Sequence, residues 1–87
     1  MLPTMQNFSG ARTAQVIRIG YLQLYFSYSQ LIGFQIDGQQ VVVCANNHGR
    51  LTTEKHLLLL EADKSKWISD LEFSQQWLET SNRLFSY

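Results

Sequence analysis

The dipeptide Asp37-Gly38 constrains the fold more than any other feature of this sequence. It separates the apolar residues 31–36 from the apolar residues 41–44, and Asp-Gly between two such runs is typical of a two-residue β-hairpin turn. With Asp37 and Gly38 at the centre of the turn, the spacing predicts pairing of Phe34 with Val41. The predicted buried face of this hairpin consists of Ile32, Phe34, Val41 and Val43.

The opposite face of the hairpin contains a glycine, Gly33, among apolar neighbours. On the predicted register Gly33 lies across from Val42, and its missing side chain leaves room for another element to approach closely. Both faces of residues 41–44 are apolar, which indicates a central strand that is covered from two sides.

Two further strands are predicted before the hairpin. Residues 13–19 form a β-branched run that Gly20 ends, and residues 21–28 place apolar side chains on one face at a period of two. The second face of the later strand carries Tyr21 and Tyr25, which would form an aromatic patch. This patch would meet either a covering helix or a partner protein, and the covering helix is favoured.

Two helices are predicted after the hairpin. The first lies near residues 53–62, with a threonine of the Thr52-Thr53 pair as its N-cap. Helical spacing predicts an inward stripe on this helix, which Leu58 and Leu59 widen; it consists of Thr53, His56, Leu57, Leu60 and Glu61. The second lies near residues 70–85, because Ser69 and Glu72 have the spacing of a capping box.

The second helix carries two apolar rows, separated by a seam of small residues that consists of Ser74 and Ser81. Such a groove can pack across the sheet or against a second copy of the same helix. Packing on the sheet is favoured, because a sheet with an apolar face must be covered. The first row consists of Leu71, Leu78 and Phe85, and the second of Phe73, Trp77 and Leu84.

These elements predict an α+β fold, in which an antiparallel sheet of three to four strands between residues 12 and 45 is followed by two helices packed on it. The chain of 87 residues is long enough for one domain, so residues 1–87 are expected to form a single unit. Residues 1–10 are interpreted as an arm that is ordered only if another element holds it.

No residue pattern indicates catalysis, a cofactor or a metal site. Cys44 is the only cysteine and follows three valines, so it is interpreted as a buried hydrophobe. His48 and His56 lack the spacing of zinc ligands. We interpret His48 as a solvated loop residue and His56 as a hydrogen-bonded core residue, and we expect the protein not to be an enzyme.

The charge balance disfavours nucleic acid as a partner. Seven basic and seven acidic residues give a formal net charge of zero, so no field attracts polyanions and copies of the chain do not repel one another. A nucleic-acid-associated role remains the alternative, and the residues that would serve it are Arg12, Arg18, Arg50 and Lys55.

The sequence predicts a cytoplasmic location. It carries one cysteine, no basic-then-apolar leader and no apolar run near about 18 residues, so neither secretion nor a membrane is expected.

The polar loop of residues 46–50 offers a weak anion-binding hypothesis, because Arg50 precedes a helix N-terminus. The favoured interpretation is an ordinary capped helix.

Three segments resemble a recurrent pattern. They are residues 25–34 (Tyr-Phe-Ser-Tyr-Ser-Gln-Leu-Ile-Gly-Phe), residues 41–46, and residues 51–57 (Leu-Thr-Thr-Glu-Lys-His-Leu). Across residues 21–62 the chain is similar to a family of small uncharacterised phage and mobile-element proteins, with a Ser-Tyr strand, a hairpin and a Thr-Thr-x-x-His-Leu helix. The resemblance implies a compact hairpin-plus-helix domain of mobile-element origin, with no known activity.

The resulting functional hypothesis is a non-catalytic protein-interaction domain that self-associates, as an accessory or host-modulating factor of a phage or mobile element. The candidate interaction residues are Tyr21, Tyr25, Arg50, Trp77, Ser74, Ser81 and Leu84.

Overall fold

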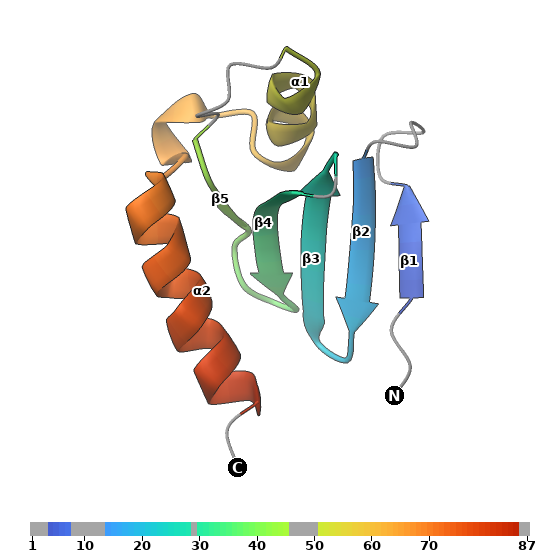
Figure 1. The fold of residues 1–87 in the computed structure, drawn as a ribbon, viewed down its shortest axis with the longest axis vertical. Coiled ribbons are helices and arrows are strands. Elements are labelled where there is room, and N and C mark those ends of the chain that lie inside the picture. The colour runs from blue at the N-terminus through green and yellow to red at the C-terminus, as the bar shows by residue number, and fades with distance from the viewer. Residues whose placement is uncertain (1–3, 8–13, 29, 46–50, 86–87) are drawn as a thin grey trace.

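The structure, a computed structural model, describes residues 4–7, 14–28, 30–45 and 51–85. In these residues an antiparallel sheet, with strands in the order β1-β2-β3-β4-β5, is followed by two helices (Figure 1). The predicted α+β class is confirmed. The strands are β1 Thr4–Asn7, β2 Ala14–Ile19, β3 Leu22–Ser27, β4 Gln30–Ile36 and β5 Val42–Val43. The helices are α1 Leu51–Leu60 and α2 Asp70–Phe85, with a 3-10 turn η1 at Lys64–Lys66 between them.

The sheet extends one strand beyond the predicted region. Strands β2 to β5 lie between residues 14 and 43, and β1 comes from the segment that the sequence assigned to an arm. Residues Thr4–Asn7 pair antiparallel with β2, from Thr4 opposite Arg18 to Asn7 opposite Gln15. The arm is therefore held by β2, which supplies the ladder hydrogen bonds that an isolated segment lacks.

The predicted register of the β4–β5 hairpin is wrong by one residue. Phe34 pairs with Val42 instead of Val41, and Gly33 pairs with Val43 instead of Val42. The turn itself lies where it was predicted, since the Gln39 N–H donates to the Ile36 carbonyl at 2.9 Å.

A side chain binds the chain directly after the turn. The Gln35 amide Nε2 donates to the Gln39 carbonyl at 3.0 Å. The one-residue slip moves Val43 to the face of Gly33 and places Val42 on the face of Phe34, because side chains alternate along a strand.

The two helices contact β4 from opposite faces. A Cβ on Gly33 would lie 3.2 Å from Leu60 Cδ1 of α1, so α1 packs closely where the glycine leaves space, as predicted. The ring of Phe34 points the other way. It packs against Phe73 and Trp77 of α2, each with a ring centroid 5.4 Å away.

Helix α1 begins and ends two residues earlier than predicted. It spans Leu51–Leu60, so Thr53 lies inside the helix and is buried instead of acting as an N-cap. The predicted inward stripe is confirmed for Thr53, His56 and Leu57, all of which are buried. Leu59, which was expected to widen the stripe, is 63% exposed.

Strand β5 lies at the edge of the sheet instead of being the predicted central strand, and the connector between the helices covers that edge. Trp67 donates its indole N–H to the Glu61 carbonyl at 2.9 Å, which holds the connector against the end of α1. Ile68 then forms a parallel bridge with Cys44, with its N–H 3.0 Å from the Val43 carbonyl. This bridge covers polar groups that an edge strand would leave unpaired. Within the described residues, no helix has the length and apolar character needed to cross a membrane.

Candidate functional site

Helix α2 begins after the Ser69 N-cap that the sequence predicted, which is one half of the predicted capping box. The Ser69 hydroxyl accepts from the Glu72 backbone N–H at 3.2 Å, and the Phe73 N–H donates to the Ser69 carbonyl at 2.8 Å. The helix begins at Asp70 and ends at Phe85, as expected. Figure 1 shows that it lies alongside β5, at the edge of the sheet.

The inner face of α2 consists of few residues. Phe73 is 7% exposed, Thr80 is 6% exposed, and Trp77 is half-buried. Phe73 and Trp77 tilt against Phe34 at interplanar angles of 54° and 56°, which is a favourable arrangement for aromatic rings. Trp77, a predicted interaction residue, therefore belongs to the packing of α2 on the sheet.

The outer face of α2 is apolar and exposed. Leu71 is 70% exposed and Leu78 is 59% exposed. The two residues lie two turns apart on the same side of the helix. Ser74 is exposed between them, and Ser81 is half-buried and donates its hydroxyl to the Leu78 carbonyl at 3.2 Å. We call Leu71, Ser74, Leu78 and Ser81 the outer face of α2; it contains no charged residue.

The predicted row of Phe73, Trp77 and Leu84 is only partly buried. Leu84, one of the candidate interaction residues, is 39% exposed near the end of α2. It lies on the side of the helix that faces the sheet at Phe73, but closer to the C-terminal end. The side chain of Phe85 lies outside the described residues.

The tyrosine patch is not formed. Tyr21 lies in the turn between β2 and β3 and is 75% exposed. Tyr25 lies in β3 and is half-buried, and its hydroxyl donates to side-chain oxygens of Gln23 at 2.9 Å and Gln35 at 3.1 Å. Burial raises the pKa of Tyr25. Tyr25 therefore orders Gln35 within the sheet, and Tyr21 is exposed alone.

Several basic and loop residues were also candidates. Arg50, the loop of residues 46–50 and Arg12 lie outside the described residues. Arg18 pairs with the Asp37 carboxylate at 3.2 Å, and both side chains are about half-exposed, at 49% and 40%. This pair anchors the hairpin turn to β2. Lys55 is exposed on α1.

A buried hydroxyl cluster joins α1 to the sheet, and the sequence predicted only part of it. Ser27 Oγ lies 2.8 Å from His56 Nδ1 and 3.1 Å from Thr53 Oγ1. The prediction that His56 is a hydrogen-bonded core residue is confirmed. Burial lowers the pKa of His56, because the buried site lacks the water that would solvate a charged ring. Nothing in the alternation of residues 21–28 singled out Ser27.

The Ser27–His56 pair has the spacing of a hydroxyl and its base, but not the accessibility of a reactive site. Ser27 is 1% exposed and His56 is 3% exposed, so a substrate cannot reach the hydroxyl in this conformation. The pair instead satisfies polar groups that the packing of α1 on the sheet removes from water.

The remaining nucleophile is also buried. Cys44 is 6% exposed, as predicted, and burial raises its pKa to about 11. A thiol with this pKa is protonated at neutral pH and is a poor nucleophile. In the described part of the chain, no cluster of three or more His, Cys, Asp or Glu side chains could hold a metal ion.

Comparisons with known proteins give no further guidance: no family model, no curated protein and no solved structure matches this chain.

Proposed function

We propose that this protein is a non-catalytic interaction domain that self-associates through the outer face of α2. It serves as an accessory or host-modulating factor of a phage or mobile element and acts in the cytoplasm. The resemblance of residues 21–62 supports the mobile-element origin. The single buried thiol of Cys44 supports a reducing compartment.

The observation that carries this proposal is the exposure of Leu71 and Leu78 on one side of α2, at 70% and 59%. Full burial of a leucine side chain contributes about 1.5–3 kcal/mol, so covering both gives a substantial driving force for association. The two leucines form a small apolar patch on one side of the helix, which a partner can cover.

A comparison with α1 favours α2 as the interface. Helix α1 also exposes two leucines two turns apart, Leu51 at 74% and Leu59 at 63%. The residue between them is the exposed Lys55, whose charge would have to leave water on association. The corresponding position on α2 is Ser74, which is small and uncharged.

A second copy of the chain is the partner that fits the outer face. In a two-fold interface the same surface meets itself, so Leu71 of one copy can pack against Leu78 of the other when the two helices run antiparallel. Ser74 then lies near the crossing point, where a small side chain permits close approach. The net charge of zero imposes no general repulsion between copies.

Sedimentation velocity over a concentration series from low to high micromolar tests this proposal. We expect the wild-type protein to form a dimer and the Leu78→Lys variant to remain monomeric, because the interface would bury an unpaired charge. The matched control is Leu59→Lys, which places the same charge on α1 and should dimerise like the wild type. A wild-type protein that stays monomeric at high micromolar concentration would contradict the proposal.

A further inference from the structure

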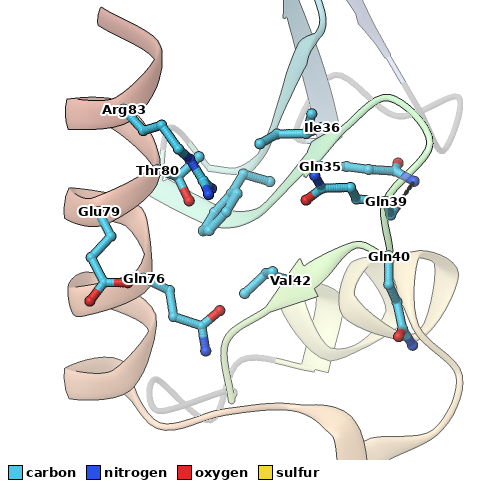
Figure 2. Close-up of a pocket in the computed structure, with 10 residues that line it drawn as sticks. Gln35, Ile36, Gln39, Gln40, Val42, Gln76, Glu79, Thr80 and Arg83 are labelled. Atoms are coloured by element: carbon cyan, nitrogen blue, oxygen red, sulfur yellow. Dashed lines mark hydrogen bonds between the residues drawn. The ribbon is translucent and has the colours of Figure 1, made fainter. Parts of the chain in front are cut away.

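A cavity lies between the β4–β5 hairpin and the inner side of α2, away from the outer face (Figure 2). Its volume is about 320 Å³, at the lower end of the range for small-molecule sites. Ile36 and Val42, which are half-buried, supply apolar surface, and Gln35, Gln76, Thr80 and Arg83 supply polar groups. At 100° per residue, Thr80 lies about 200° around α2 from Leu78. The cavity is thus separate from the proposed dimer interface.

Thr80 is the observation that points to a ligand. It is 6% exposed, and its hydroxyl has no hydrogen-bond partner among the described residues. Buried hydroxyl groups are nearly always hydrogen-bonded, and a helical Ser or Thr commonly donates to its own helix. The neighbouring Ser81 does so, through the Leu78 carbonyl. The Thr80 hydroxyl instead remains available to a molecule in the cavity.

Arg83 adds a positive charge to the same cavity. Its guanidinium forms no ion pair with any described residue, although Glu79 lies one turn earlier on the same helix. Figure 2 shows the Arg83 side chain extending toward Thr80, whereas the Glu79 carboxylate points away from it. A guanidinium presents a planar fork of donors that matches a carboxylate.

The two glutamines complete the polar wall. Gln35 is held in place, because its Oε1 accepts from the Tyr25 hydroxyl at 3.1 Å and its Nε2 donates to the Gln39 carbonyl at 3.0 Å. The amide of Gln76 extends from α2 toward Val42 (Figure 2). The polar groups therefore surround an apolar surface formed by Ile36 and Val42.

We propose that this cavity binds a carboxylate that carries a compact apolar group, with the carboxylate on Arg83 and Thr80 and the apolar group on Ile36 and Val42. Both the C-terminal residue of a peptide and a free short-chain acid have this chemistry. The cavity volume fits a ligand of one or two residues.

Titration of the isotope-labelled protein by NMR tests the proposal with N-acetyl-leucine as the probe. We expect shifts of resonances from Phe34, Thr80 and Arg83. The affinity should fall about tenfold or more in Arg83→Gln and in Thr80→Val, because each variant removes a hydrogen bond to a charged group. N-acetyl-leucinamide, which lacks the carboxylate, should bind at least about tenfold more weakly.

The matched control is Arg18→Gln, which removes an arginine that pairs with Asp37 outside the cavity lining and should leave the affinity unchanged. Acetyl-Gly-Gly-Leu and 4-methylpentanoate distinguish the two sources: tighter binding of the tripeptide identifies a peptide C-terminus, and tighter binding of the acid identifies a free acid. No shifts at millimolar probe, equal binding of the amide, or unchanged binding in Arg83→Gln would each overturn the proposal. None of these results depends on dimerisation.

Discussion

The two helices are attached to the same strand in different ways. Helix α1 does not begin at the threonine N-cap that the sequence predicted, but it buries Leu57 completely and bonds Thr53 and His56 to Ser27. Helix α2 has a strong start signal and a clear apolar pattern, but it packs on the sheet through few side chains and exposes Leu71 and Leu78. Tertiary contacts hold the helix whose start was predicted wrongly. The helix with the strong signal keeps one face available for a partner.

The largest expected effect concerns the buried leucine of α1. Leu57 is 0% exposed, so Leu57→Ala should lower the free energy of unfolding by about 2–5 kcal/mol through lost burial and a residual cavity. Leu59→Ala, two residues later and 63% exposed, should change it by no more than about 0.5 kcal/mol. Urea denaturation of both variants measures the difference. Equal effects would show that α1 is not anchored through its predicted inward stripe.

The effect of removing a buried hydroxyl can be compared between the two helices, because Thr53 of α1 and Thr80 of α2 are both 6% exposed. Thr53→Val should destabilise the protein by about 1–3 kcal/mol, because Ser27 loses a buried hydrogen-bond partner. Thr80→Val should stabilise the ligand-free protein by about 1 kcal/mol, because it removes an unpaired buried hydroxyl. Urea unfolding under identical conditions measures both changes. A loss of stability in Thr80→Val comparable to that in Thr53→Val would mean that the Thr80 hydroxyl is already bonded.

Mild acid should weaken the attachment of α1 through His56. Burial lowers the pKa of His56 below its ordinary value of 6.5, so the unfolded chain binds the proton more readily than the folded protein. The neutral ring of His56 therefore stabilises the folded protein fully above about pH 6.5. This stabilisation is lost as the pH falls through the pKa of His56 in the folded protein. The hydrogen bonds to Ser65 lower the pKa of Asp63. The contribution of Asp63 to the stability of the fold is therefore lost only at a more acid pH than that of His56.

The free energy of unfolding, measured by urea between about pH 7 and about pH 5, should therefore decrease in the wild type. The decrease should be smaller in His56→Gln, which has no titrating ring. If the free energy of unfolding of the variant shows the same pH dependence, the decrease comes from a titrating group other than His56.

Local patterns in the sequence were sufficient to predict the position of some elements. The Asp37-Gly38 turn and the Ser69 cap specify their structures through neighbouring residues, so the hairpin position and the start of α2 were predicted correctly. The hairpin register was predicted wrongly by one residue, because residues 41–44 are apolar on both faces and their pattern does not specify the pairing. The burial of Thr53 inside α1 was also missed as an alternative to capping, because its partner Ser27 lies 26 residues away in the sequence.

The candidate site was predictable to a similar degree. Helical periodicity identified the Leu71 and Leu78 row and the Ser74–Ser81 seam, but it did not show which row would face the sheet. That choice depends on Phe34, whose ring contacts Phe73 and Trp77. Periodicity also gave no sign that Thr80 would be buried beside a cavity.

Disulfide cross-linking of Ser74→Cys tests most directly whether the outer face of α2 joins two copies. Cys44 is buried and its pKa is raised to about 11, so the introduced thiol is the reactive one. Under mild oxidation the Ser74→Cys variant should form a covalent dimer rapidly, because the two positions lie near the helix crossing. Glu79→Cys, exposed on another side of α2, is the control and should stay largely monomeric. Equal cross-linking of both variants, or none in Ser74→Cys, would contradict the proposed interface.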